Sequence, residues 1–461
     1  MENQCSGVFV GTDKRGRHTP HNKTSDAALK AVRSHIESFP VVDGHYTRKD
    51  SNRKYLGAEL NISRMYQLYQ EKNKDNLPDN QIVSQTIYRK IFNEEYNFSF
   101  HIPKKDQCNI CVNYQKATSS GTLTPEEKHN YDKHIAKKIR ARQEKKTDKD
   151  HAKENLNTMV ATFDLQAVLQ IPCSLVSQIF YMRKLNSYNL SIYNLASKHA
   201  TCYLWSEVDA KRGSCEIGTC LYLQLMSLQR NIKHVILYSD ACAGQNRNQF
   251  IATCLMHAVT TLPNIETIDH KFLESGHTQM ECDSMHSAIE FAKKKTEIYV
   301  PQQWSTVIRM ARRNDPYLIV PLTFEDIYDF KGLQKQIFRY RKEDINGKKF
   351  KWLKMRWLRF EKKDPDHISF KHKFDDSFRK MRVTEKTRKG RPVNVMEIPK
   401  RYTAKQTVSA AKKKDLLNLC KTGVIPSEYH SFYKGLQSDS KTPDILPDPD
   451  FEEDEIDSEK E

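Results

Sequence analysis

The spacing of apolar and polar positions divides the chain into a helical first part and a mixed α/β second part. Apolar side chains recur at helical spacing over residues 25–39, 55–69 and 83–92. From residue 157 onward, short apolar runs alternate with helical segments, which is typical of a sheet covered by helices. We therefore predict a mostly helical region over residues 1–105 and an α/β core over residues 157–300.

The order of elements in this core indicates one fold class. The predicted elements are strands at 158–164, 185–193 and 200–205, a helix at 214–228, a strand at 234–239, a helix at 246–260, a strand at 265–273 and a helix from about 283. The order β-β-β-α-β-α-β-α is the layout of ribonuclease H-like (RNase H-like) proteins, the class of retroviral integrase cores. The predicted fold is therefore α/β, with a mixed five-stranded sheet and helices.

Acidic residues stand at the ends of these predicted elements. Asp164 ends the first strand, Asp240 follows the fourth, and Asp283 lies at the start of the last helix. In open α/β sheets, ligands collect at the carboxyl ends of the strands. Hard carboxylate oxygens suit Mg²⁺ or Mn²⁺, and two such ions about 3.5–4 Å apart serve phosphodiester chemistry. The pattern therefore predicts a two-metal site.

Three further residues are candidates for the same site. His286 lies one turn after Asp283 and shares its helix face, and Glu290 extends the same stripe by four residues. We rank Asp283 ahead of Glu290 as the third metal ligand. The alternative for Glu290 is a surface acid paired with Lys293. Glu216 stands where ribonucleases H place an additional carboxylate, or it is a first-turn acid favoured by the helix dipole.

A second metal site is predicted from cysteine and histidine spacing. Cys108 and Cys111 form a C-x2-C pair, and His129 and His134 follow seventeen residues later. Thiolate and imidazole ligands at such spacing are typical of structural zinc. The two histidines are five residues apart on a helix, about 140° around its axis, so His101 is an alternative ligand. The other interpretation is two free thiols at a turn.

The helix that carries these histidines begins with a capping box at residues 124–127 and continues to about residue 155. It has too few apolar residues to bury a face, which predicts a helix that is solvated or exposed to a partner. Its excess of positive charge suits contact with phosphate. We place it with the cysteines in one region, residues 106–156.

The overall charge indicates a polyanionic partner. The chain carries a formal charge of +17; the last eighteen residues have ten acids and one Lys, so residues 1–443 carry +26. Residues 444–461 are predicted to be a disordered acidic tail. A basic cluster at residues 386–391 is a candidate nuclear signal. DNA in the nucleus is therefore the expected partner.

Composition also bounds the compartment. The sequence has no run of 18 apolar residues, which predicts no membrane-spanning helix. Its first residues lack the charged and then apolar design of a signal peptide. We therefore expect a reducing compartment, in which the eleven cysteines are free thiols and metal ligands rather than a disulfide framework.

DNA contacts are predicted at two further places. The helices at 55–69 and 83–92 can form a helix-turn-helix, with Gln85, Arg89 and Lys90 facing the major groove. An ordinary packed helical pair is the alternative. Arg247, in the turn after the fourth core strand, could position a phosphate or simply hold the turn.

Residues 301–443 are predicted to be a basic α+β extension of the core. Residues 350–360 interleave Trp with Lys and Arg, which suits either nucleic-acid stacking or an ordinary exposed β-ribbon. A last amphipathic helix is predicted over residues 410–421.

Several of these segments resemble a large family of transposon-derived proteins in animal genomes. The resemblance spans nearly the whole chain and is carried by residues 88–92, 104–108, 163–166, 211–217, 239–248, 275–290 and 425–429. It implies a transposase-type fold in which Asp164 and Asp240 match the first two metal-binding acids. Residues 283–286 match a D-x-x-H element of several transposase superfamilies. Relative to the family pattern the chain begins late, which implies a further upstream zinc or DNA-binding module.

The resemblance implies DNA strand cleavage and transfer with two Mg²⁺ or Mn²⁺ ions, together with a structural zinc, and it admits a homo-oligomer. Copies of this kind are often domesticated, so whether this chain is an active Mg²⁺-dependent nucleotidyltransferase stays open. One alternative is a non-catalytic DNA-binding protein derived from a transposase. The other is an RNase H-like nuclease acting on RNA or hybrids.

Overall fold

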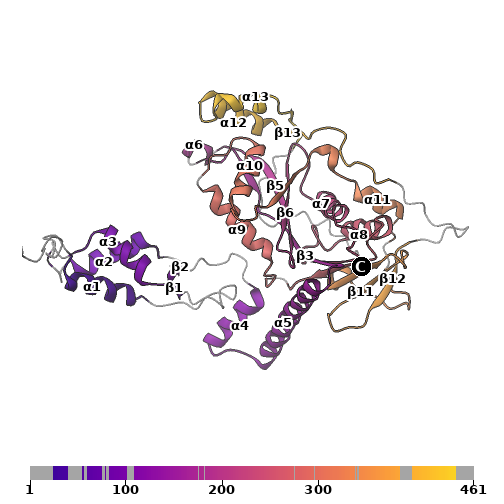
Figure 1. Ribbon diagram of the computed structural model, residues 1–461, viewed down its shortest axis with the longest axis horizontal. Coiled ribbons are helices and arrows are strands. Elements are labelled where there is room, and N and C mark those ends of the chain that lie inside the picture. The colour runs from indigo at the N-terminus through magenta and orange to yellow at the C-terminus, as the bar shows by residue number, and fades with distance from the viewer. Residues whose placement is uncertain are drawn as a thin grey trace, which may run out of the picture. The chain divides into compact units, whose positions relative to one another are not determined.

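The computed structural model describes residues 24–39, 54–56, 60–74, 78, 82–100, 108–174, 176–180, 182–274, 276–294, 296–337, 339, 342–384 and 397–442 (Figure 1). The chain divides into two compact units, residues 1–107 and residues 108–461. His101, the basic cluster at 386–391 and the acidic tail lie outside the described residues.

The first unit is helical, as predicted, with two short strands. Its elements are α1 (Asp26–Glu37), β1 (Lys54–Leu56), α2 (Ile62–Asn73), α3 (Gln85–Glu95) and β2 (Phe98–Phe100), the last pairing in parallel with β1. Ser25, Asn61 and Ser84 cap the three helices with side-chain oxygens. At their centre the buried ring of His35 lies 2.9 Å from the Tyr88 hydroxyl. Burial lowers the pKa of His35 to about 4, so this ring is neutral.

A mixed ten-stranded sheet organises the second unit. Its order is β12-β11-β10-β8-β7-β3-β5-β6-β9, with β4 beside β5. The strands are β3 (Thr158–Leu165), β4 (Leu169–Ile171), β5 (Leu185–Asn194), β6 (Ala200–Ser206), β7 (His234–Ser239), β8 (Thr267–Phe272), β9 (Leu318–Pro321), β10 (Trp357–Glu361), β11 (His367–Lys371) and β12 (Arg379–Arg382). Strands β3, β7 and β8 run parallel to one another, and β5 is antiparallel to β3 and β6. The α/β class and the mixed sheet are thus confirmed.

The predicted strand number needs correction, because the region after residue 300 completes the sheet at both edges. β9 pairs in parallel with β6, while β10 pairs antiparallel with β8 through five residue pairs. Residues 350–360 are therefore not an exposed ribbon. Leu358 and Phe360 are buried against the sheet's helical cover, and Trp357 on the other face is nearly buried too. The pairing of β10 with β8 fixes this arrangement.

Helices cover both faces of the sheet. The alternation of β3 places Met159, Ala161 and Phe163 in a core with α7 (Ser214–Met226), α8 (Gln249–Thr261) and α11 (Phe330–Ile337), which gather on one side in Figure 1. Val160 faces the opposite core, which includes residues of α5 (Pro125–Glu154) and of α9 (Glu281–Lys293). The remaining elements are α4 (Asn109–Ser119), α6 (Ser177–Phe180), α10 (Pro301–Met310), α12 (Ala410–Lys421), α13 (His430–Lys434), β13 (Val408–Ser409), β14 (Ser438–Asp439) and short 3₁₀ turns at Phe324–Asp326, Trp352–Lys354 and Ser427–Tyr429.

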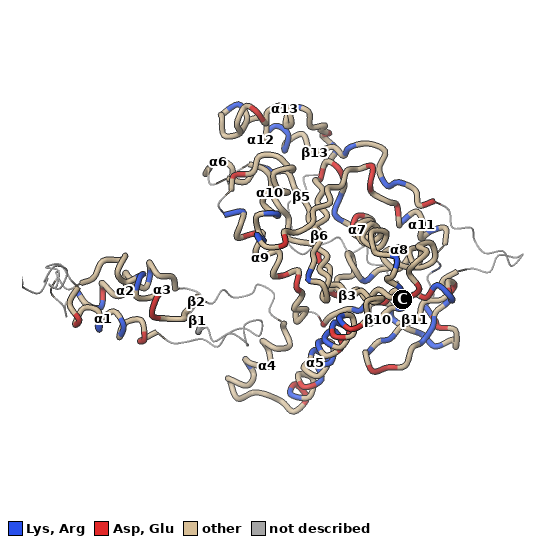
Figure 2. Tube along the Cα trace, in the orientation of Figure 1, with Lys and Arg blue, Asp and Glu red and all other residues tan. Residues whose placement is uncertain are grey.

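The long helix α5 packs on the sheet through charged side chains, which corrects the prediction of a wholly solvated or partner-exposed helix. Acidic and basic residues mingle along it (Figure 2). Glu144 and Asp148 accept from the ammonium of Lys271, a residue of β8 that is 1% exposed, at 2.7 and 2.5 Å. The Tyr238 hydroxyl also donates to Asp148 at 2.5 Å. Ion pairs therefore replace the apolar stripe on which the prediction relied.

Two predictions from composition can be compared with the described residues. Within these ranges, no helix is both long and apolar enough to cross a membrane. The cysteines found there are free thiols.

Candidate metal centre and carboxylate site

The parallel pairing of β3 with β7 brings two of the predicted acids together at the carboxyl ends of these neighbouring strands. The last residue pair of these parallel strands is Thr162 with Tyr238. Asp164 and Asp240 each follow two residues later, so in register they lie at the same level of neighbouring strands and on the same face. The carboxyl ends of the strands are where these two acids were predicted to lie.

Helix α9 brings the third acid to the same end of these strands. The buried thiol of Cys282 donates to the carbonyls of Thr162 on β3 and Ser191 on β5, at 3.5 and 3.4 Å. This contact fixes the first turn of α9 across the two strands. Asp283 follows directly, and its carboxylate accepts from the Met280 amide at 3.1 Å.

The charges of two of these acids act on the third, Asp164. Burial raises the pKa of Asp164 well above its ordinary value, and the negative charges of Asp240 and Asp283 raise it further. A cation beside Asp164 would relieve this opposition to its ionisation. Among the described residues, however, these three acids do not form a group whose ligand atoms all lie within 4.8 Å of one another.

Neutral polar groups surround these acids. His286 lies with Nδ1 3.8 Å from an Asp164 oxygen and Nε2 3.1 Å from the Ser191 hydroxyl. Burial lowers the pKa of His286 to about 4, so its ring is uncharged and does not compete with a cation. One oxygen of Asp240, Oδ1, accepts from the Asn246 side chain at 2.6 Å and from the Cys242 amide at 3.2 Å.

Two other predicted acids are engaged elsewhere. Glu290 pairs with Lys293 at 3.0 Å and its side chain is 43% exposed, which matches the surface alternative stated for it. Glu216 is buried, and it accepts a 2.5 Å hydrogen bond from the hydroxyl of Tyr402. Neither is among the charges that raise the pKa of Asp164.

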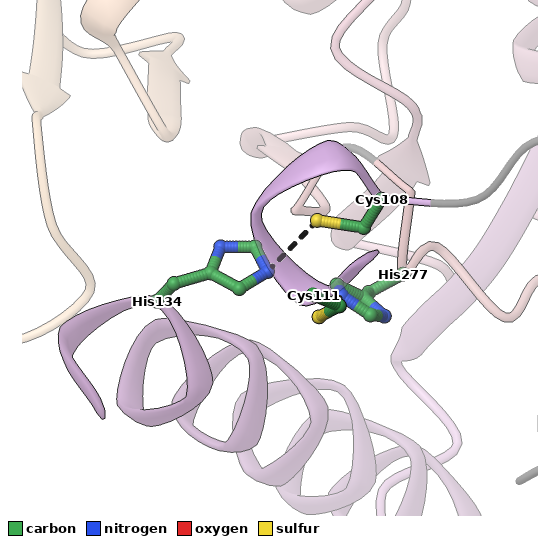
Figure 3. A group of neighbouring side chains, drawn as sticks. All are labelled: Cys108, Cys111, His134 and His277. Atoms are coloured by element: carbon green, nitrogen blue, oxygen red, sulfur yellow. Dashed lines mark hydrogen bonds between the residues drawn. The ribbon is translucent and has the colours of Figure 1, made fainter. Parts of the chain in front are cut away.

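A compact cysteine and histidine cluster lies in the same unit. The ligand atoms of Cys108, Cys111, His134 and His277 all lie within 4.8 Å of one another. Cys108 Sγ is 3.2 Å from His134 Nε2, and Cys111 Sγ is 3.2 Å from His277 Nε2 (Figure 3). Among the residues that the structure describes, this is the one group of three or more Cys, His, Asp or Glu with such close ligand atoms. It could hold a metal ion.

The fourth member of this cluster differs from the prediction. His129 is exposed on α5 and lies outside the group, whereas His277 comes from the connection between β8 and α9. The angular separation of His129 and His134 on one helix explains why both do not point at the same ion. His277 is 166 residues from Cys111, so no local spacing could have identified it.

The electrostatics of the cluster leave the Cys111 thiol and the His134 ring uncharged. Burial, followed by the neighbouring Cys108, raises the pKa of the Cys111 thiol to about 11. Burial lowers the pKa of His134 and keeps that ring neutral, the form that binds metals. A bound cation would deprotonate the thiols, because a coordinating thiol loses its proton outright.

The residues predicted to contact DNA are spread over both units. In the first, Arg89 and Lys90 are exposed on α3, while Gln85 donates to the Ser63 hydroxyl at 3.1 Å. Eleven residues separate α2 from α3, against three to four in a typical helix-turn-helix. In the second unit, Arg247 lies 5.8 Å over the Phe272 ring, and burial lowers its pKa to about 10.

Part of the chain matches a family model that carries no assigned activity. Residues 192–369 match a family described as a domain of unknown function, DUF7869. The matched segment contains Asp240, His277 and Asp283, but it begins after Asp164 and the two cysteines. No curated protein and no solved structure matches the chain. The chain is therefore similar to this domain family along the sequence from the end of β5 into β11.

Proposed function

We propose that this protein is a transposase-like enzyme that cleaves and transfers DNA strands at a two-metal carboxylate site. The observation that carries the proposal is the convergence of Asp164, Asp240 and Asp283 from the ends of two adjacent parallel strands and the start of α9. Acids so placed suit hard divalent cations, Mg²⁺ or Mn²⁺, which take oxygen ligands.

The topology supports an RNase H-like core for this enzyme. The five predicted core strands form the contiguous order β6-β5-β3-β7-β8 in the middle of the sheet. The strand carrying Asp164 is thus the neighbour of the strand leading to Asp240, as a shared metal site requires. The added outer strands leave this central arrangement unchanged.

The side chains fit such ions. When bound, two metal ions clamp the attacking and leaving oxygens of a phosphodiester and stabilise the developing charge. The hydrogen bonds that Asp240 accepts from the Cys242 amide and the Asn246 side chain both go to Oδ1, so they would hold this carboxylate while Oδ2 met an ion.

The charge of the chain supports DNA as the substrate. Residues 1–443 carry +26, and phosphate contacts by Lys and Arg supply most sequence-independent affinity for DNA. A nuclear location and a homo-oligomer remain predictions from the sequence.

Replacing Asp283 by Asn should abolish Mg²⁺-dependent strand cleavage, whereas replacing Glu290 by Gln should leave it within about twofold of wild type. The reason is that the Asp283 charge acts on Asp164, while Glu290 forms a surface pair worth at most about 1 kcal/mol. The measurement is nicking of a labelled plasmid that carries the genomic sequence flanking the gene, with Mg²⁺ or EDTA.

Each of the two variants removes one negative charge from α9, so each is a control for the loss of charge in the other. Loss of cleavage in Glu290→Gln with retention in Asp283→Asn would exchange their roles. A wild-type protein that binds the plasmid and never cuts it would favour the non-catalytic DNA-binding alternative.

We also propose that zinc occupies the cluster of Cys108, Cys111, His134 and His277. Two sulfur and two nitrogen ligands in a four-membered set are typical of structural zinc sites. The purified protein should therefore contain one zinc per chain by elemental analysis. Cys111→Ser should lose it, since a hydroxyl does not replace a thiolate ligand, while Cys173→Ser should retain it because that half-buried cysteine lies outside the cluster. Full zinc content in Cys111→Ser would remove this assignment.

A further inference from the structure

The two candidate sites share one segment of chain. The connection from β8 to α9 leaves the sheet beside Asp240, where the Leu273 amide donates to the Ser239 carbonyl at 2.9 Å. It contributes His277 to the cysteine and histidine cluster and ends in the first turn of α9, which carries Asp283. Only five residues separate the metal ligand from the third carboxylate.

This connection is pressed against Cys108. Gly276 has a φ of +73°, and a Cβ there would lie 3.0 Å from the Cβ and 3.2 Å from the Cα of Cys108. Gln279 also takes a positive φ, of 46°, which costs energy for a residue other than glycine. Backbone of this kind persists only where its surroundings hold it in place.

Helix α5 supplies part of that support. The ammonium of Lys145 donates to the Gln279 carbonyl at 2.8 Å and pairs with Glu281 at 3.0 Å. His134, three turns earlier on the same helix, belongs to the cluster with His277. Helix α5 thus contacts the last residues of the connection directly, through Lys145. It meets an earlier residue of the connection, His277, through the cluster.

A metal bound by the cluster would hold the connection more strongly than the contacts described above. Without one, Cys111 and His277 share a contact of 3.2 Å that involves a weak sulfur donor. Coordination would join His277 to ligands on α4 and α5 by bonds whose formation is coupled to folding.

We infer that the metal bound by Cys108, Cys111, His134 and His277 positions Asp283 for catalysis. Removing the metal would release the connection, and with it the first turn of α9. His277 is thus a positioning residue as well as a metal ligand. The role of Asp283 in this inference rests on the proposed function, whereas the attachment of the connection does not.

Hydrogen exchange tests the attachment without reference to activity. Amides of residues 276–284 should exchange at least about tenfold faster in His277→Ala than in wild type, since exchange reports local opening. Chelation of the wild-type protein should give the same change. The matched control is His129→Ala, an exposed histidine of α5 outside the cluster, and it should exchange like wild type. His277→Cys, which keeps a metal ligand, should restore both zinc content and slow exchange.

Mn²⁺ binding, followed by electron paramagnetic resonance, tests the positioning. His277→Ala should weaken Mn²⁺ binding at the carboxylates about 10- to 100-fold, the range seen when groups that orient metal ligands are removed. Unchanged exchange over residues 276–284 would overturn the attachment. Faster exchange with unchanged Mn²⁺ affinity would overturn the positioning role alone. A wild-type protein that binds no Mn²⁺ would instead overturn the proposed function and the role of Asp283, leaving exchange to decide the attachment.

Discussion

Replacing Asp240 by Asn is expected to slow Mg²⁺-dependent strand cleavage about a thousandfold, because metal stabilisation of the reacting phosphate contributes several kcal/mol and each 1.36 kcal/mol is tenfold in rate. The substitution keeps the shape of the side chain. Its remaining oxygen can still accept from the Asn246 side chain and the Cys242 amide, which hold Asp240 now. The fold at the end of β7 should therefore survive, and only the charge that attracts the cation is lost.

DNA affinity should barely change in the same variant. Affinity depends on Lys and Arg contacts with phosphates, so the slope of the binding constant against salt concentration should match that of wild type. Single-turnover cleavage and fluorescence anisotropy at several salt concentrations separate the two effects. Cleavage by Asp240→Asn at the wild-type rate would contradict the carboxylate site. Weakened binding with a smaller salt slope would mean that a cation held by Asp240 contributes to DNA affinity, contrary to this expectation.

The sequence predicted those parts of the structure that depend on local pattern. The apolar run from 234 to 239 coincides with β7, and the amphipathic segment 410–421 coincides with α12. The capping box at Thr124 is present with Pro at the start of α5. Asp164 and Asp240 were found because each follows a short apolar run, and strand pairing then placed the two runs side by side.

What the sequence could not predict depends on pairing between distant segments. Trp357 of β10 donates to the buried Asp269 of β8, 88 residues earlier. No local periodicity of the sequence predicts that these two strands pair. The same holds for His277, which joins the cysteines only because the connection after β8 folds back against Cys108. A spacing rule finds ligands on one short segment and misses those brought in by the tertiary fold.

The environment of α5 was wrongly predicted for a related physical reason. The helix lacks an apolar stripe, and hydrophobic periodicity alone therefore favours a solvated helix. Its partner is a lysine inside a strand, Lys271, which a binary pattern treats as an exposed position. Only the structure shows that acids of the helix and a base of the sheet meet across 123 and 127 residues of sequence.

Replacing Lys271 by Met should therefore lower the free energy of unfolding by about 3–5 kcal/mol, the cost of removing one partner from a buried ion pair. Methionine fills a similar volume, but Glu144 and Asp148 would then face each other without their shared cation. The control is Lys233→Met, which breaks an exposed pair with Glu266 and should cost less than about 1 kcal/mol. Urea denaturation of both variants and of wild type measures the difference.

At acid pH, the difference in the free energy of unfolding between wild type and Lys271→Met should become smaller. Burial alone would raise the pKa of Glu144, but hydrogen bonds and charge from Lys271 and Arg140 outweigh it and hold that pKa below its ordinary value. Its contribution is therefore full above the ordinary pKa, about 4.3, and is lost as the pH falls through the lower folded value. Adding Glu144→Gln and Asp148→Asn to Lys271→Met should recover part of the stability at neutral pH. A loss that is independent of pH and unrelieved by the triple change would mean that packing of the Lys271 stem, rather than its charge, docks α5.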